Sequence, residues 1–188
     1  DWQGRRLNKV LANTLTCNSI YLRQIMQQYA AGKSDDLAYR LARRNAHNAD
    51  AALSTTLANM LMEPGHFRKE ADVGFRFLVL SHTLLSYLSG LGAHRETQLP
   101  PDVREHLIDG AGVRLAASID EIAQGLASKL PIAIQSDEEE ALANTLEQMP
   151  DELDEGQRLV QTQLALMCRQ LGPLRTLAAH LIKETSED

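Results

Sequence analysis

Apolar side chains recur at helical spacing along most of this chain, and this periodicity constrains the fold more than any other feature. Within residues 2–31 the apolar stripe consists of Leu7, Val10, Leu11, Leu15, Tyr21, Leu22, Ile25 and Tyr29. Positions three and four apart share one face of an α-helix. The β-branched residues are mostly isolated and do not alternate with polar ones, so no stretch has the pattern of a strand. We therefore expect an all-α protein.

Helix-stop and helix-start signals divide the chain. Gly32 ends the first helix, and Ser34 or Asp35 can cap a second one. That second helix runs to about Glu63 and ends at Pro64-Gly65. The third and most apolar helix covers about 69–91, and a linker at 97–101 leads to a fourth helix that starts at Pro101. A break at 131–136 follows, after which Ser136 and Glu139 form a capping pattern for a short helix that ends at Pro150. The last helix starts near Asp151 and is expected to be kinked or split at Gly172-Pro173.

These signals predict an antiparallel helical bundle of five to seven helices. A chain of 188 residues is long enough to bury a core of its own. We expect one domain over residues 1–188, and a boundary between two smaller units would fall near 95–101. The apolar stretch at 75–91 contains Arg76 and His82 and is too short to span a membrane, so it predicts a buried helix.

The charges are divided unevenly between the two halves of the chain. Residues 1–94 contain 11 Lys and Arg against 7 Asp and Glu, whereas residues 95–188 contain 8 against 18. Phosphate binding requires a basic surface, so the acidic half excludes nucleic acid as a partner of the whole domain. Opposite charges on the two halves can match within one chain or between copies, which makes a homo-oligomer one expected assembly.

The second predicted helix has a basic strip. Arg40, Arg44 and His47 follow one another at i, i+4 and i+7, with Arg43 at their flank. Because arginine binds carboxylate and phosphate groups through paired hydrogen bonds, the strip fits a small organic anion, a lipid headgroup or a partner protein. The alternative is a solvated face that pairs with acidic residues elsewhere.

The opposite face of the same helix predicts close packing against another helix. It consists of mostly small residues, namely Ala38, Ala42, Asn45, Ala49, Ala52, Leu53, Thr56 and Met60. On this face Asn45 would need a hydrogen-bond partner.

No catalytic or metal-binding motif is recognisable. No two of the six histidines are four residues apart, and Cys17 and Cys168 have no second thiol nearby in sequence. We expect reduced buried thiols, a His82 satisfied within the core, and no metal, cofactor or catalytic residue. Gly110-Ala111-Gly112 lacks the third glycine of a dinucleotide loop and is better explained by helix contact or local helix strain.

The segment Tyr39–Pro64 carries a family resemblance, through Ala42-Arg43-Arg44-Asn45-Ala46-His47-Asn48-Ala49-Asp50 and through Leu53–Pro64. It resembles the YccS/YhfK-type bacterial inner-membrane proteins of the fusaric-acid-resistance and aromatic-acid-exporter group, and the YhfK branch most closely. The likeness includes residues 7–29 and the hydrophobic helix after the segment, and it weakens towards the C-terminus.

The resemblance implies a large protein with blocks of transmembrane helices, of which this chain would be the C-terminal cytosolic region. Such a region lies on the cytoplasmic side of the inner membrane, and its expected partner is the transmembrane region of its own full-length chain. The group is associated with efflux of small organic acids and provides no catalytic residues. We therefore expect a non-enzymatic domain that serves assembly, gating or substrate handling. The alternatives are a module that senses a small organic anion and an oligomerisation module.

Overall fold

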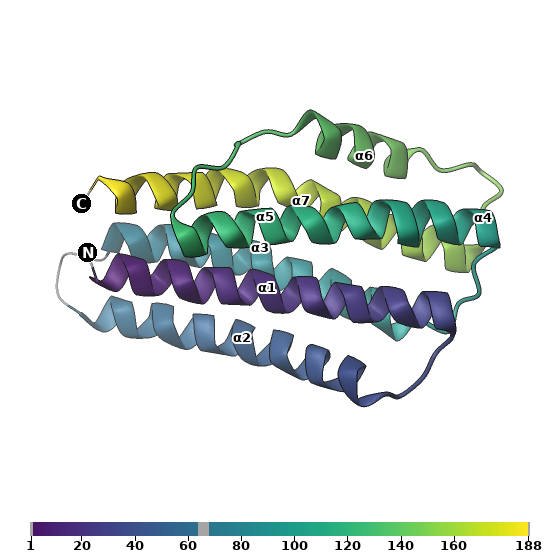
Figure 1. The fold of residues 1–188 in the computed structure, drawn as a ribbon, viewed down its shortest axis with the longest axis horizontal. Coiled ribbons are helices and arrows are strands. Elements are labelled where there is room, and N and C mark those ends of the chain that lie inside the picture. Colours follow the sequence, from purple (N-terminus) through teal and green to yellow (C-terminus); the bar gives the residue numbers. More distant parts are fainter. Residues whose placement is uncertain (1, 64–67, 188) are drawn as a thin grey trace.

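The computed structural model describes residues 2–63 and 68–187, and its described part is helical throughout apart from the connections (Figure 1). The helices are α1 (Trp2–Ala31), α2 (Leu37–Met62), α3 (Arg68–Ala93), α4 (Pro101–Arg104), the π-helix η1 (Glu105–Gly112), α5 (Val113–Ser128), α6 (Asp137–Glu147) and α7 (Glu155–Ser186). α4, η1 and α5 follow one another without a break. The predicted all-α bundle is confirmed.

Among the long helices, α2, α3 and α5 each run antiparallel to the one before, whereas the short α6 returns the chain so that α7 runs parallel to α5 (Figure 1). The central helices are α1, α3, α5 and α7: α1 packs on α3 and α5, and α7 packs on the same two helices. α2 lies against α1 and α3, whereas α6 lies against α7. These two outer helices therefore occupy opposite edges of the bundle (Figure 1).

The core follows from the apolar stripes. Every member of the predicted stripe on α1 is buried except Val10, which is half-buried. The buried apolar side chains of all the long helices form one continuous cluster. Since burying a single leucine stabilises a fold by about 2 kcal/mol, these stripes supply the main driving force for the bundle. That residues 1–188 form a single domain stays a prediction.

The start of α2 differs from the sequence expectation. The N-cap is Asp36, whose carboxylate accepts a 2.7 Å hydrogen bond from the Tyr39 backbone N–H. Ser34 instead hydrogen-bonds Gln28 and Asp36. An aspartate one position nearer the helix satisfies the free N–H groups of the first turn, which explains the shift. Pro64 and Gly65, the predicted end of this helix, lie outside the described residues.

The structure also tests the predictions for the glycines at 110–112 and for the kink or split at Gly172-Pro173. Gly112 lies in η1 and faces α1 so closely that a Cβ there would collide with Met26 Sδ, which confirms helix contact as the reason for the glycine. Pro173 does not split α7, which continues through it. Gly172 and Pro173 both lie on the exposed side of α7.

Candidate functional site

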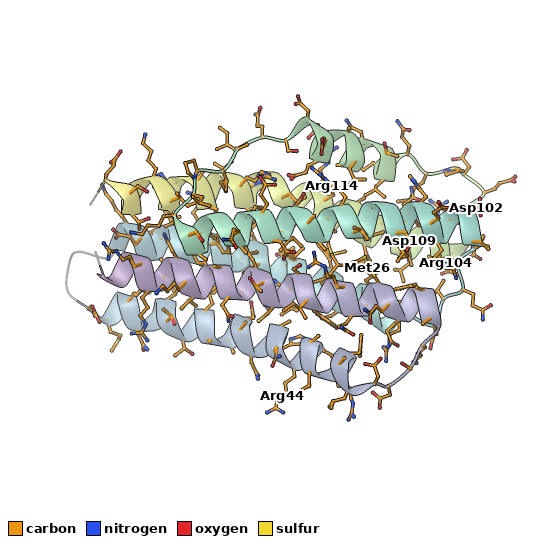
Figure 2. The ribbon with its side chains drawn as sticks, viewed as in Figure 1. Met26, Arg44, Asp102, Arg104, Asp109 and Arg114 are labelled. Carbon is orange, nitrogen blue, oxygen red and sulfur yellow. The ribbon has the colours of Figure 1, made fainter. Side chains whose placement is uncertain are left out.

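The basic strip lies on the solvent side of α2. Arg40, Arg43, Arg44 and His47 are all exposed. Arg40 forms an ion pair of 3.6 Å with Asp35, just before the helix. Arg44 and His47 make no hydrogen bond or ion pair with any described residue, and Figure 2 shows Arg44 pointing away from the bundle. The structure therefore brings three arginines and a histidine onto one outer surface without a set of acidic partners.

One edge of the strip lies on the flank of α2 that faces α3. Arg43, His47 and Asp50 are spaced i, i+4 and i+7, so they share a flank of the helix. On that flank the Asp50 carboxylate lies 2.9 Å from His82 Nδ1 of α3. His82 is exposed, so its predicted place in the core is wrong, because it lies on the outer side of α3.

The prediction for the packing face of α2 needs one further correction. Asn45 is exposed rather than packed, and Ala38 and Ala52 are exposed too. The buried positions are Tyr39, Ala42, Ala46, Ala49, Leu53, Leu57 and Met60. The true packing face is thus centred one position away, along Ala42, Ala46 and Leu53, and Asn45 meets water at its edge.

A groove of about 590 Å³ lies between α1 and α2. Its lining residues are Arg5, Arg6, Lys9, Val10 and Asn13 from α1, and Ala49 and Ala52 from α2. The two alanines leave the groove open because neither has a side chain long enough to reach across it. Cations from three positions of α1 border this space.

The chemistry of the groove suits a small anion with an apolar body. Arg5 and Lys9 are exposed, and neither forms a hydrogen bond or ion pair with the described residues. Val10, Ala49 and Ala52 provide apolar surface beside these charges. A carboxylate or phosphate could meet the cations while its carbon skeleton covers the alanines.

The groove and the strip are separate features. Ala49 and Ala52 line the groove on the α1 side of α2, whereas Asp50 contacts α3 on the other side. Sequence reasoning identified the strip and missed Arg5, Arg6 and Lys9. A signal was present, since residues 2–31 contain no Asp or Glu while Arg5-Arg6 and Lys9 lie one turn apart. Between residues 2 and 62, 8 Lys and Arg stand against 3 Asp.

The opposite edge of the bundle has a different arrangement of charge. Arg175 of α7 is only 2% exposed and donates from Nε to Glu139 of α6 at 2.8 Å. Its other nitrogens donate to Glu121 of α5 at 3.1 Å and to the Ala133 carbonyl oxygen at 3.2 Å. One guanidinium thus joins two helices and the α5–α6 connection to α7, with its donors satisfied.

This buried cluster is electrically matched. Burial is the largest influence on the pKa of Glu139 and raises it. The hydrogen bonds from Arg175, the nearby Ser118 hydroxyl and the positive charges of Arg175 and Arg114 together outweigh burial and hold that pKa below its usual value. Glu139 is the residue of the predicted capping pattern. Its backbone N–H does bond Ser136 Oγ at 3.3 Å, while its carboxylate is engaged by Arg175. The capping prediction is therefore confirmed for Ser136, whereas Glu139 has a structural role that the pattern did not indicate.

The thiols have no activating surroundings. Cys168 is buried against α6, and burial raises its pKa to about 11. Burial also raises the pKa of the half-buried Cys17. A nucleophilic cysteine requires the opposite shift, so neither thiol is prepared for covalent catalysis. No group of three His, Cys, Asp or Glu side chains suited to a metal ion occurs within residues 2–63 and 68–187.

Comparison with known proteins identifies relatives for about half of the chain. The chain is 44% identical to the inner membrane protein YccS of Escherichia coli over 109 residues, which is 58% of this chain and 15% of that protein. An uncharacterized protein of Haemophilus influenzae is 50% identical over 51% of this chain and 13% of its own length. The uncharacterized protein ORF2 of Neisseria gonorrhoeae is 33% identical over 49% of the chain and 22% of its own length.

These matches confirm the resemblance to the YccS type of inner-membrane protein. The closer likeness to the YhfK branch stays a prediction, as does a C-terminal position in the longer protein. The chain corresponds to less than a quarter of the length of each of these relatives. No family model and no solved structure matches the chain. Among the described helices, none combines the length and the apolar character needed to cross a bilayer.

Proposed function

We propose that this bundle is a non-enzymatic cytosolic domain of an inner-membrane transport or efflux protein. In this role it would serve assembly, gating or substrate handling beside the transmembrane region of its own full-length chain. The similarity to YccS, whose name places that relative in the inner membrane, is the observation that carries the proposal. The raised pKa values of both thiols support a role other than covalent catalysis.

The uncompensated charge on the α1–α2 edge supports contact with something outside the bundle. Free cations that do not stabilise their own fold are available to a partner or ligand. In the strip this is Arg44, and in the groove they are Arg5 and Lys9.

The test uses the full-length protein in inverted membrane vesicles. Uptake of aromatic carboxylic acids is compared between the unaltered protein and a variant with Arg40→Gln, Arg43→Gln and Arg44→Gln. A role in gating or assembly predicts reduced transport or a changed oligomer in detergent extracts. If transport and assembly both stay the same, the strip has no part in the function.

The groove favours a second candidate function, in which the domain senses a small organic anion. A ligand that binds the folded state raises its apparent stability, by about 2.7 kcal/mol at a concentration 100-fold above Kd. Thermal unfolding is therefore measured with a series of aromatic carboxylates. Sensing predicts a rise in Tm that the Arg5→Gln, Lys9→Gln variant loses. A series without any rise in Tm would exclude this function for the compounds tested.

A further inference from the structure

The outward face of α2 differs from an ordinary solvated helix surface in having no acidic side chain. Its outermost positions follow helical spacing and are all exposed, namely Leu37, Leu41, Arg44, Asn48, Ala51, Thr55 and Met62. The acidic residues nearest to this face are all engaged. Asp36 caps the helix, Asp35 pairs with Arg40, and Asp50 bonds His82. Glu63, which follows Met62 at the C-terminal end, is exposed and also has an interaction within the protein.

Large apolar side chains are exposed at both ends of the same helix. Leu37 is 61% exposed and Leu41 44% near the N-terminal end, while Leu61 is 50% and Met62 85% exposed near the C-terminal end. Arg40, Arg43 and Arg44 lie on either side of Leu41, close to the N-terminal apolar group. A helix of 26 residues is about 39 Å long, so it presents basic and apolar side chains together at its N-terminal end and apolar side chains at its C-terminal end.

The distribution of charge across the molecule determines which edge turns towards a negatively charged surface. α2 forms one edge of the bundle, and α6 forms the opposite edge (Figure 1). The first turn of α6 contains four acidic residues, and Asp151, Glu152, Asp154 and Glu155 follow before or at the start of α7. A negatively charged plane attracts the α2 edge and repels the α6 edge, so it orients the molecule with α2 towards the plane.

We infer that α2 docks with its long axis on the anionic surface of a lipid bilayer. Leu37, Leu41 and Met62 enter the headgroup region, while Arg40, Arg43 and Arg44 meet lipid phosphates. Anionic headgroups attract basic residues near the surface, and exposed apolar side chains add burial at the interface. This inference rests on the proposed function, since a domain of an inner-membrane protein lies beside a bilayer, and it names the partner of the strip.

A bilayer fits this face better than a second copy of the chain. A second copy would offer fewer free carboxylates than its sequence suggests, since Glu138 pairs with Arg114 and both Glu140 and Glu147 pair with Arg169. At the α6 edge, the exposed carboxylates that neither form an ion pair with a described residue nor cap a helix are Asp137, Asp151, Glu152 and Glu155. A second copy would also leave the apolar ends of α2 against a charged edge. A bilayer accommodates both the arginines and the apolar ends.

The experiment measures flotation of the 188-residue chain with two kinds of vesicle, equimolar phosphatidylglycerol with phosphatidylcholine, and phosphatidylcholine alone. We expect binding to the anionic vesicles that falls with added salt. Each arginine near the surface contributes roughly a fivefold change in partitioning, so the Arg40→Gln, Arg43→Gln, Arg44→Gln variant should bind on the order of 100-fold more weakly. The Leu41→Ser, Met62→Ser variant should also bind more weakly, with its salt dependence unchanged.

A charge-matched control separates docking by this face from general attraction. Arg104→Gln, Arg158→Gln and Lys183→Gln remove the same charge from α4 and α7, which do not pack on α2. This control should bind within about twofold of the unaltered chain if each distant charge contributes little. Equal losses in the two triple variants would overturn the inference, and so would equal binding to both kinds of vesicle.

Other outcomes distinguish this inference from the proposed function. If the strip variant changes the sedimentation of the chain but not its flotation, the face binds a second copy and the inference is wrong. If flotation is unaffected while transport by the full-length protein falls, the inference fails and the proposed function stands. If the strip variant loses flotation as expected but transport is unchanged, the inference about docking stands and the proposed role in transport is wrong.

Discussion

α2 and α6 are the two outer helices of the bundle, and they attach to it by different means. α6 buries Ala143 and Leu146 in the core. It is joined in addition through ionic contacts to α5 and α7, in which Arg175, Arg169 and Arg114 meet its carboxylates. α2 is joined through apolar side chains such as Leu53 and Leu57, while its arginines face outwards. Figure 2 shows the contrast, with Arg114 between α5 and α6 and Arg44 directed into solvent.

Charged side chains therefore have different roles at the two edges of this bundle. Around α6 each buried charge has a partner, so removing one partner destabilises the fold. On α2 the charges have little structural role, so removing them should affect binding and leave stability nearly unchanged. The predictions below test this contrast, from the largest expected effect to the smallest.

The largest effect is expected at Arg175. Arg175→Ala leaves Glu139 buried without its main partner, which should lower the free energy of unfolding by about 3–5 kcal/mol. Urea denaturation followed by circular dichroism measures the change. Arg44→Ala is the matched control from the other edge and should change stability by less than about 0.5 kcal/mol. Equal small effects at the two sites would remove the contrast between the edges.

The apolar attachment of α2 should give the next largest effect. Leu57 is fully buried, and a Cβ added at Gly74 of α3 would collide with it. Leu57→Ala should lower the free energy of unfolding by about 2–5 kcal/mol through lost burial and a cavity. Thr55→Ala, on the outer side of the same helix, should stay within about 0.5 kcal/mol. A Leu57→Ala loss below about 1 kcal/mol would mean that other contacts hold α2.

The pH dependence of stability tests the ionic attachment of α6. Because the folded-state pKa of Glu139 lies below its usual value, its contribution is present above the unfolded pKa of about 4.3 and is lost as the pH falls through the folded pKa. Urea midpoints measured from pH 5.5 down to pH 3 should therefore fall more steeply for the unaltered chain than for Glu139→Gln. Parallel curves would show that this carboxyl group does not have the lowered pKa.

A smaller effect is expected at the exposed rim of α6. Arg169 is 38% exposed and pairs with Glu140 at 2.9 Å and with Glu147. Exposed ion pairs contribute little to stability, so Arg169→Gln should shift the urea midpoint much less than Arg175→Ala does. High salt should reduce the difference further. A loss as large as that of Arg175→Ala would place this rim among the main supports of the fold.

The sequence predicted the helices well because the chain is strongly periodic. The apolar stripe on α1 and the glycine contact at Gly112 both follow from local patterns that the bundle preserves. The sequence did not predict the partner of Glu139, because Arg175 lies 36 residues away and only the fold brings the two together. His82 was misplaced for a similar reason, since an apolar neighbourhood in sequence does not say which side of α3 faces water.

The candidate site was predictable only in part. The strip on α2 is visible within two turns of one helix, whereas the groove requires the pairing of α1 with α2 that sets Lys9 beside Ala52. Which α2 positions meet water depended on the rotation of that helix, and Asn45 shows that an error of one position reverses the environment of a side chain.

The central claim is that the α2 edge faces an anionic bilayer while the α6 edge faces away. Spin labels at Asn48→Cys on α2 and at Thr145→Cys on α6 test it, in a chain with Cys17→Ser and Cys168→Ala bound to phosphatidylglycerol-containing vesicles. A lipid-soluble relaxation agent should act more strongly on the α2 label, and a water-soluble one more strongly on the α6 label. Equal accessibility at the two positions, or the reverse order, would contradict the account.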